Sequence, residues 1–275
     1  MMKDGKNIIE LWRQGCENGD ADAMFNLALC YLKGCFVPED KPKAIRLLQQ
    51  AVDLCNADAM FNLGICYKRG TGVAKDMQKA VELFERAVDL GVVDAMNALA
   101  KCFFFGDGVM QDRKRAADLL QQAVDLGNSP AAMNSLGLCY GNGYGVEEDK
   151  QKAIDLFQRA VDLDDSDAMV VLGACFQHGD SVPVDKTKAV ELYKRAADLG
   201  NSYGMHSLGK CYEKGNGVAK DKAKAIELYQ RAVDLGNKNA KEALKKLTAG
   251  DSAVPVSSEM LHRTTSQSLM SFAYS

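Results

Sequence analysis

The sequence has few of the residues on which most catalytic and metal sites depend. It contains three histidines and one tryptophan, and no segment fits the H-E-x-x-H, G-x-S-x-G or G-x-x-x-x-G-K-[ST] patterns. The 34 Lys and Arg residues do not outnumber the 37 Asp and Glu residues, so the basic excess typical of nucleic-acid binding is missing. No apolar run approaches the roughly 18 residues of a membrane span, and the first residues do not resemble a secretory signal. We therefore expect no nucleic-acid partner, no membrane span, no metal and no cofactor, and a cytoplasmic location with the nucleus as the alternative.

A repeat of about 36 residues runs through most of the chain. An Ala-Met pair, Gly-Met in the last copy, recurs at spacings of 36, 36, 37, 36 and 36 residues. The six copies begin at Ala23, Ala59, Ala95, Ala132, Ala168 and Gly204. Six units thus share one register, and the extra residue lies just before the fourth copy.

Each copy reads as two helices joined by a short loop. The first half follows A-M-x-x-L-G-x-C-Y-x-x-G and the second follows K-A-x-x-L-x-x-A-V-D-L-G, so apolar residues in both recur with helical spacing. In the second copy, Gly70 ends the first helix and Asp76 stands at the N-cap of the second. One hairpin cannot cover its own apolar faces, so neighbouring hairpins must stack. The sequence predicts an all-α fold, a right-handed α-solenoid of helix-turn-helix repeats.

The repeat also divides the chain into segments. We predict an N-terminal capping helix within residues 1–20, six repeats over 21–237, a polar C-terminal capping helix over 238–247, and a disordered Ser/Thr-rich tail over 248–275. Within the tail, Arg263-Thr264-Thr265-Ser266 resembles a basophilic kinase site, which makes Ser266 a candidate phosphosite.

The repeated motifs L-G-x-C-Y, G-x-G-V-x-x-D and K-A-x-x-L-x-x-A resemble the Sel1-like repeat family, whose units are slightly longer relatives of tetratricopeptide repeats. The resemblance covers roughly residues 6–247. It implies a superhelical, non-catalytic adaptor whose first helices line a concave surface, and whose members bridge proteins. The chain departs from the pattern at Cys35-Phe36, at Asp180-Ser181-Val182-Pro183 and at Gly204.

Six of the nine cysteines occupy one repeat position on the apolar face. Packed helices lie about 8–10 Å apart, which is too far for a disulfide or for a shared zinc ion. We interpret them as small buried residues between helices: Cys30, Cys66, Cys102, Cys139, Cys175 and Cys211. Cys35, in a loop, is expected to be exposed. A nucleophile–base pair of Cys175 and His178, on one helix, is the alternative that would make the protein a weak hydrolase or thiol enzyme.

The face of the first helices that points away from the core varies from copy to copy. In the first three copies it combines apolar side chains with lysine or arginine, a composition that suits a peptide with apolar anchors and carboxylates. We predict that a protein or peptide segment binds in this groove, formed by Phe25, Leu29, Leu32, Lys33, Phe61, Ile65, Lys68, Arg69, Lys101, Phe104 and Phe105. In the alternative, neighbouring second helices cover these rings, and the protein is an architectural or self-associating repeat protein.

Overall fold

The protein is all-α in the residues that its structure, a computed structural model, describes, namely 2–127 and 129–249. These ranges contain fourteen helices and no strand. In chain order the helices are α1 Met2–Glu17, α2 Ala21–Lys33, α3 Lys41–Asp53, α4 Ala57–Arg69, α5 Met77–Asp89, α6 Val93–Phe105, α7 Arg113–Leu126, α8 Pro130–Asn142, α9 Lys150–Asp162, α10 Ser166–His178, α11 Lys186–Asp198, α12 Ser202–Lys214, α13 Lys222–Asp234 and α14 Lys238–Ala249.

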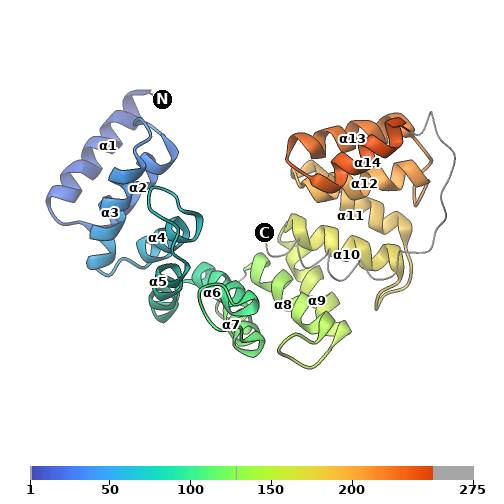
Figure 1. The fold of residues 1–275 in the computed structure, drawn as a ribbon, viewed down its shortest axis with the longest axis horizontal. Helices are drawn as coiled ribbons and strands as arrows, with labels where there is room; N and C mark the ends of the chain where they lie inside the picture. Colours follow the sequence, from blue (N-terminus) through green and yellow to red (C-terminus); the bar gives the residue numbers. More distant parts are fainter. Residues whose placement is uncertain (1, 128, 250–275) are drawn as a thin grey trace. The chain divides into compact units, whose positions relative to one another are not determined.

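The helices form hairpins, and within each of the two compact units described below the hairpins stack in chain order (Figure 1). The hairpins are α2–α3, α4–α5, α6–α7, α8–α9, α10–α11 and α12–α13. Within each compact unit described below, the second helix of one hairpin also packs on the first helix of the next. Helix α1 packs on α2 and α14 packs on α13, so a single helix adjoins each end of the repeats. The predicted all-α solenoid of stacked hairpins is confirmed.

The chain divides into two compact units, residues 1–128 and 129–275. The division falls where the repeat spacing lengthens from 36 to 37 residues. The first unit contains helices α1 to α7 and the second contains α8 to α14. The sites below are therefore described within one unit or the other.

Local sequence signals set the ends of the helices. The aspartate that precedes each second helix accepts a hydrogen bond from the backbone N–H three residues further on, at 2.9–3.0 Å. These N-caps are Asp40, Asp76, Asp112, Asp149, Asp185 and Asp221. Gly70 ends α4 in the left-handed region. Where the second loop glycine is missing, Phe36 and Ser181 adopt the left-handed conformation in its place, with φ of 64° and 65°.

In the core of each hairpin, a small residue on the first helix packs against a large residue on the second helix; we call this volume matching. A Cβ added to Gly64 of α4 would lie 2.6 Å from Cε1 of Phe84 on α5, so the glycine makes room for the ring. The same close approach joins a first-helix glycine to an aromatic ring in Gly137–Phe157, Gly173–Tyr193 and Gly209–Tyr229. The two remaining copies have alanine in place of the glycine and leucine in place of the ring, Ala28 with Leu48 and Ala100 with Leu120.

A second regular contact joins the two helices of every hairpin. The third residue of each second helix is Lys or Arg, and its charged group lies 4.0–5.4 Å from the centre of an aromatic ring on the first helix. The six pairs are Lys43–Tyr31, Lys79–Tyr67, Arg115–Phe103, Lys152–Tyr140, Lys188–Phe176 and Lys224–Tyr212. These contacts account for the Tyr and the Lys of the repeat motif as structural residues.

Candidate functional site

The predicted groove residues lie on the first helices of three successive hairpins in the first unit. We call this set the first-helix face: Phe25, Leu29, Leu32 and Lys33 on α2; Phe61, Ile65, Lys68 and Arg69 on α4; Lys101, Phe104 and Phe105 on α6. The side-chain amide of Asn56, the N-cap of α4, donates to Oδ1 of Asp22 on α2 at 2.7 Å. On α6, burial raises the pKa of Cys102 to about 11, and the nearby Lys68 ammonium of α4 partly offsets this rise. The first of these contacts joins the N-terminal ends of α2 and α4, and the second brings Lys68 of the face close to α6.

Five apolar residues of this face are half-buried: Phe25, Leu29, Leu32, Phe61 and Ile65. Phe25, Leu32 and Phe61 pack against the core with part of their surface. The ring of Phe61 lies 5.9 Å from that of Phe84, centre to centre. Neighbouring helices thus hold these side chains in place but leave part of each accessible, as a preformed contact surface requires.

The two aromatic residues at the end of α6 differ from each other. Phe105 is 46% exposed, whereas Phe104 is only 3% exposed and departs from the expectation that it faces away from the core. The two rings meet edge to face, 5.1 Å apart, and the Arg113 guanidinium of α7 lies 5.3 Å from the centre of the Phe104 ring. Phe104 is therefore a buried ring that packs against Phe105, and Phe105 is the ring that a ligand can contact.

The positive charges of the first-helix face lie beside its apolar strip. Lys33 and Arg69 are exposed, and Lys68 and Lys101 are half-buried. Within the described part of the chain, no carboxylate forms an ion pair with Lys33, Lys68 or Arg69. A ligand carboxylate can therefore approach these three cations without displacing a partner on those residues.

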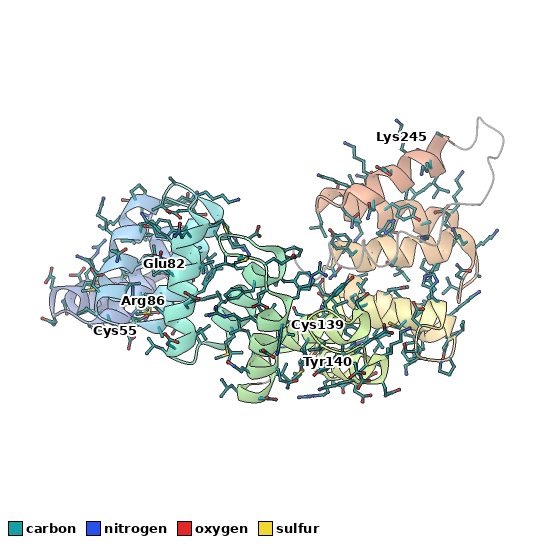
Figure 2. All side chains as sticks on the ribbon, turned by 60° about the horizontal axis from the view of Figure 1, so that its bottom comes forward. Cys55, Glu82, Arg86, Cys139, Tyr140 and Lys245 are labelled. Carbon is teal, nitrogen blue, oxygen red and sulfur yellow. The ribbon has the colours of Figure 1, made fainter. Side chains whose placement is uncertain are left out.

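The cysteines follow the predicted division into buried and exposed positions. Five of the six regular cysteines are buried, and Cys175 is half-buried. Cys35 is exposed as predicted, and so is Cys55; Figure 2 labels Cys55 and the buried Cys139. Burial raises the pKa of Cys175 to about 12, which is the opposite of what a thiolate nucleophile needs. The geometry gives no support to a Cys175–His178 pair, because the exposed His178 contacts Gln177 instead.

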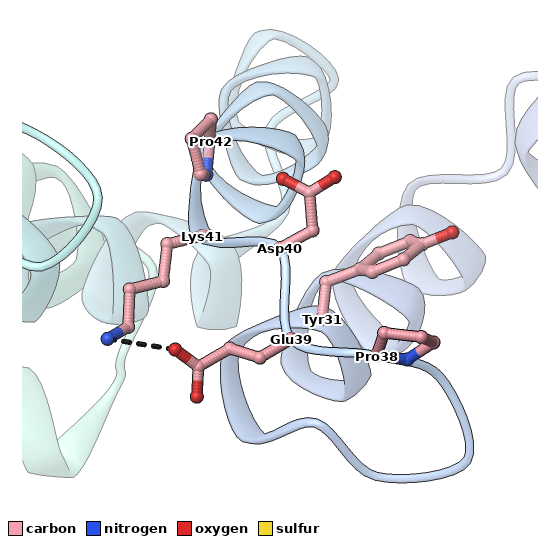
Figure 3. Close-up of a pocket in the computed structure, with 6 residues that line it drawn as sticks. All are labelled: Tyr31, Pro38, Glu39, Asp40, Lys41 and Pro42. Carbon is pink, nitrogen blue, oxygen red and sulfur yellow. Dashed lines mark ion pairs between the residues drawn. The ribbon is translucent and has the colours of Figure 1, made fainter.

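An open cavity of about 510 Å³ lies beside the first repeat loop (Figure 3). It is lined by Tyr31 and by the loop and helix start Pro38, Glu39, Asp40, Lys41 and Pro42. An ion pair of 3.0 Å between Lys41 and Glu39 occupies its edge. Because Lys41 already has a carboxylate partner and Asp40 caps α3, these charges serve the local fold.

A smaller cavity of about 240 Å³ lies within the second unit, between the fourth and fifth repeats. Its lining comes from α8, α9, α10 and the loop after α10: Leu138, Gly141, Asn142, Lys150, Ala153, Ile154, Phe157, Val171, Cys175, Asp180 and Ser181. Sequence reasoning missed this cavity. The sequence does contain an indication of it, because Gly141 occupies a position where every other copy has a larger side chain.

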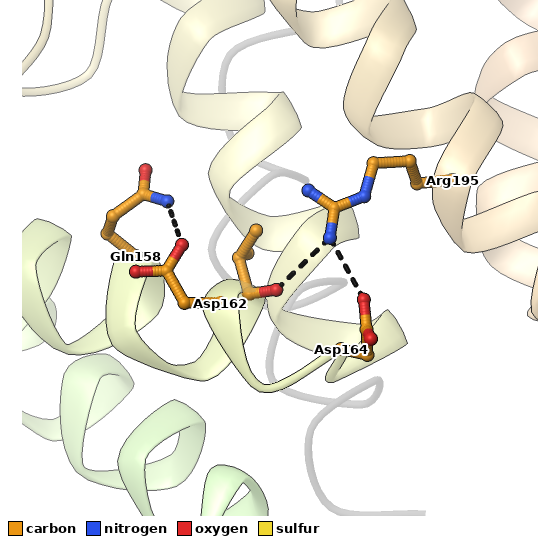
Figure 4. A network of polar contacts seen from close by, with 5 residues as sticks. Gln158, Asp162, Asp164 and Arg195 are labelled. Atoms are coloured by element: carbon orange, nitrogen blue, oxygen red, sulfur yellow. Dashed lines mark hydrogen bonds and ion pairs between the residues drawn. The ribbon is translucent and has the colours of Figure 1, made fainter.

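Polar contacts join successive repeats in the second unit. The guanidinium of Arg195, on α11, donates to the carbonyl oxygen of Val161 at 3.3 Å and to Oδ1 of Asp164 at 3.0 Å (Figure 4). In the same view, the side-chain amide of Gln158 donates to Asp162 within α9. The Arg195 contacts fix the α10–α11 hairpin against the end of α9, whereas the Gln158 contact stabilises α9 itself.

A set of titratable groups on α12 faces α13. The ring of His206 lies 5.7 Å from that of Tyr229, whose hydroxyl donates to Oε2 of Glu213 at 2.6 Å. Burial, together with the charge of Lys210, lowers the pKa of His206 to about 4, so this ring is neutral at pH 7. Burial and the charge of Lys214 also lower the pKa of Lys210. Burial therefore favours the uncharged forms of both His206 and Lys210.

Three further expectations can be compared with the described residues. Ser266 lies outside them, as does most of the predicted tail; α14 itself ends at Ala249. In residues 2–127 and 129–249, no helix is long and apolar enough to cross a membrane. Over the same ranges, no cluster of three or more His, Cys, Asp or Glu residues is placed to hold a metal ion.

The sequence matches the model of the Sel1 repeat in six segments, residues 21–54, 57–92, 93–128, 130–165, 166–201 and 202–237. No curated protein matches the sequence.

Solved structures are similar to the whole array of repeats. A Sel1 repeat protein from Oxalobacter formigenes is 27% identical, with 78% of this chain and 85% of that one covered and a TM-score of 0.73. A protective antigen of uropathogenic Escherichia coli with the same fold is 26% identical over 90% of this chain, with a TM-score of 0.65. This chain covers only 52% of the length of the antigen. An immunity protein from Pseudomonas aeruginosa, at 22% identity, 86% and 89% coverage and a TM-score of 0.56, shares the fold alone.

Proposed function

We propose that this chain, which belongs to the Sel1 repeat family, is a non-catalytic scaffold that binds a peptide or protein segment on its first-helix face. The observation that carries the proposal is the strip of half-buried apolar side chains on α2 and α4, next to three cations without ion-pair partners among the described residues. Stacked repeats present such strips as continuous surfaces, and this favours an extended ligand over a small molecule.

The side chains of the first-helix face indicate which kind of ligand would bind there. Phe25, Phe61 and Ile65 offer partly exposed apolar surface, and such anchors supply most of the binding energy at protein interfaces. Arg69 and Lys33 lie at the edge of the strip, where they attract a ligand carboxylate and accelerate association. The preferred ligand is therefore a segment that combines apolar or aromatic residues with Asp or Glu.

Selection from a display library of random 12-residue peptides on the full chain tests this proposal. Enriched peptides should contain apolar residues together with Asp or Glu. Their binding should weaken at least tenfold when Phe61 is replaced by Ser or Arg69 by Glu. The matched control is Arg86→Glu on α5, an arginine that is also exposed but lies outside the face (Figure 2). Peptides that bind the Phe61 and Arg69 variants as tightly as the wild type would contradict the proposal.

Self-association is the second candidate function, and a row of exposed leucines favours it. The leucine at the C-terminal end of each second helix is 42–65% exposed in all six copies: Leu54, Leu90, Leu126, Leu163, Leu199 and Leu235. Exposed leucines that recur at every repeat offer an apolar edge to a second copy. Sedimentation equilibrium of the wild type and of Leu90→Lys distinguishes the two functions. A wild-type dimer that dissociates in the variant would support self-association, and a monomer at all concentrations would refute it.

A further inference from the structure

The cavity in the second unit arises from a missing side chain. Gly141 is the second-to-last residue of α8, at a position that carries Leu32, Lys68, Phe104, Gln177 or Glu213 in the other copies. A Cβ placed on Gly141 would make only an ordinary contact, 3.5 Å from Cβ of Ala153. The close packing that explains Gly64 and Gly137 therefore does not explain this glycine. Gly141 instead borders the open cavity of about 240 Å³.

The third repeat shows what the same position holds when it is filled. There Phe104 is almost fully buried, and its ring lies under the guanidinium of Arg113, the first residue of α7. In the fourth repeat, Gly141 takes the place of Phe104, and Lys150, the first residue of α9, takes the place of Arg113. Lys150 lines the cavity, so a cationic residue again borders the space that corresponds to the Phe104 ring.

The rest of the lining suits an aromatic group. Leu138, Ile154 and Val171 supply apolar walls, and the buried Phe157 adds an aromatic ring, a group that packs well against other aromatic rings. The sulfur of Cys175 is half-buried, and burial keeps it protonated, as a soft neighbour for a ring. Asp180 can accept a backbone N–H from the segment that carries the ring.

The size of the cavity limits its ligand. Sites for drug-sized molecules usually measure about 300–1,000 Å³, and this cavity measures about 240 Å³. A single Phe or Tyr side chain fits this space, with the rest of its chain outside. Lys150 is exposed, and its ion pair with Glu148 at 3.5 Å is at the surface, so its side chain remains adjustable.

We propose that this cavity binds one aromatic side chain of a partner polypeptide, which takes beneath Lys150 the position that Phe104 takes beneath Arg113 in the third repeat. The site is separate from the first-helix face, since all its lining residues belong to the second unit. It would anchor one residue of a bound chain, so the aromatic residue sets the register of the ligand along the repeats. The proposal does not depend on binding at the first-helix face.

The test uses the full chain and N-acetyl-phenylalanine methylamide as the probe, titrated to tens of millimolar and followed by amide NMR shifts. Saturable shifts are expected at Gly141, Lys150 and Ser181. Gly141→Phe should weaken the probe at least tenfold, because the new ring fills the cavity. Gly141→Ala is the matched control, which also removes the helix glycine but leaves most of the space open and should bind as the wild type does.

Lys150→Ser keeps the test decisive even if Gly141→Phe does not fold. This exposed substitution should weaken the phenylalanine probe a few-fold and leave N-acetyl-leucine methylamide unchanged. Shifts that do not saturate, that persist in a folded Gly141→Phe variant, or that the leucine probe produces equally would overturn the proposal. Probe binding that appears only after Phe272 and Tyr274 are both replaced by Ser would also overturn it, because the chain's own aromatic residues would then fill the cavity. A Phe61→Ser variant, which alters only the first-helix face, should bind the probe normally.

Discussion

Replacing Gly64 by alanine should destabilise the first unit, although alanine is the better helix former. The new Cβ would lie 2.6 Å from Cε1 and 2.8 Å from Cδ1 of Phe84, and 3.3 Å from the carbonyl oxygen of Ala80. Phe84 is fully buried, so its ring has no free space to enter. Overpacking of this kind costs about 1–3 kcal/mol, and the gain in helix propensity is about 1 kcal/mol. The difference between these two terms is a net loss of up to about 2 kcal/mol.

A second substitution should restore much of that loss. Phe84→Leu alone removes buried volume and should cost roughly 1–2 kcal/mol. Combined with Gly64→Ala, it recreates the pairing that the chain already uses in Ala28 with Leu48. The double variant should therefore be at least about 1 kcal/mol more stable than the sum of the single losses predicts.

Urea unfolding followed by circular dichroism measures the cycle, with hydrogen exchange of α4 and α5 to locate the effect, since repeat arrays can unfold in parts. Gly141→Ala is the control, because its Cβ meets no atom closer than 3.5 Å. It should gain about 0.5–1 kcal/mol. If Gly64→Ala is stabilising to the same degree, or if the double variant equals the sum of the single variants, the volume-matching argument is refuted.

Three further predictions concern capping, thiols and pH. Asp76→Ala should cost about 1 kcal/mol and speed hydrogen exchange in the first turn of α5, because the 3.0 Å bond to Lys79 N–H is lost; unchanged exchange would contradict the capping role. A thiol reagent at pH 8 should label the exposed Cys35 in the native protein but reach Cys102 only after unfolding, since burial raises the pKa of Cys102 to about 11. The pKa of His206 is about 4 when folded and 6.5 ordinarily, so the unfolded chain binds more protons between these values. Stability from the neutral ring is therefore complete above about pH 6.5 and falls as the pH drops toward 4, and His206→Gln should flatten this part of a urea-midpoint curve against pH.

The repeat, the hairpins and the caps were predictable because each depends on residues that are close in the sequence. Apolar spacing defines a helical face within one helix. The carboxylate of Asp76 and the backbone of Gly70 act on residues within one turn of themselves. These patterns recur six times, so the structure of a copy that departs from the motif can be predicted from the copies that match it. Such local information is sufficient for the secondary structure and for the order of stacking.

The candidate site was less predictable, because burial at the end of a first helix depends on the other helix of the hairpin. A helical wheel places Phe104 and Phe105 on the same outer face, but the structure buries Phe104 next to Arg113 and leaves Phe105 exposed. The wheel also treats Gly141 as an empty position, whereas α9 and the loop after α10 surround it and form a cavity. Only the packing of separate helices distinguishes a supporting ring, an accessible ring and a vacant site.

Comparison of the six copies distinguishes positions that are needed for helix packing from positions that are available for ligand binding. At positions that pack the two helices of a hairpin, a change in one residue is matched by a change in its partner, as in Gly64 with Phe84 and Ala28 with Leu48. Every copy also keeps a cation next to an aromatic ring. The position of Gly141 follows no such rule, because its six residues range from glycine to phenylalanine and include both charges. Stacking therefore does not require one particular residue at this position, so its differences can serve ligand binding without loss of the fold. The two sites proposed here, on the first-helix face and beneath Lys150, both draw on that freedom, and substitutions there should change what the protein binds before they change whether it folds.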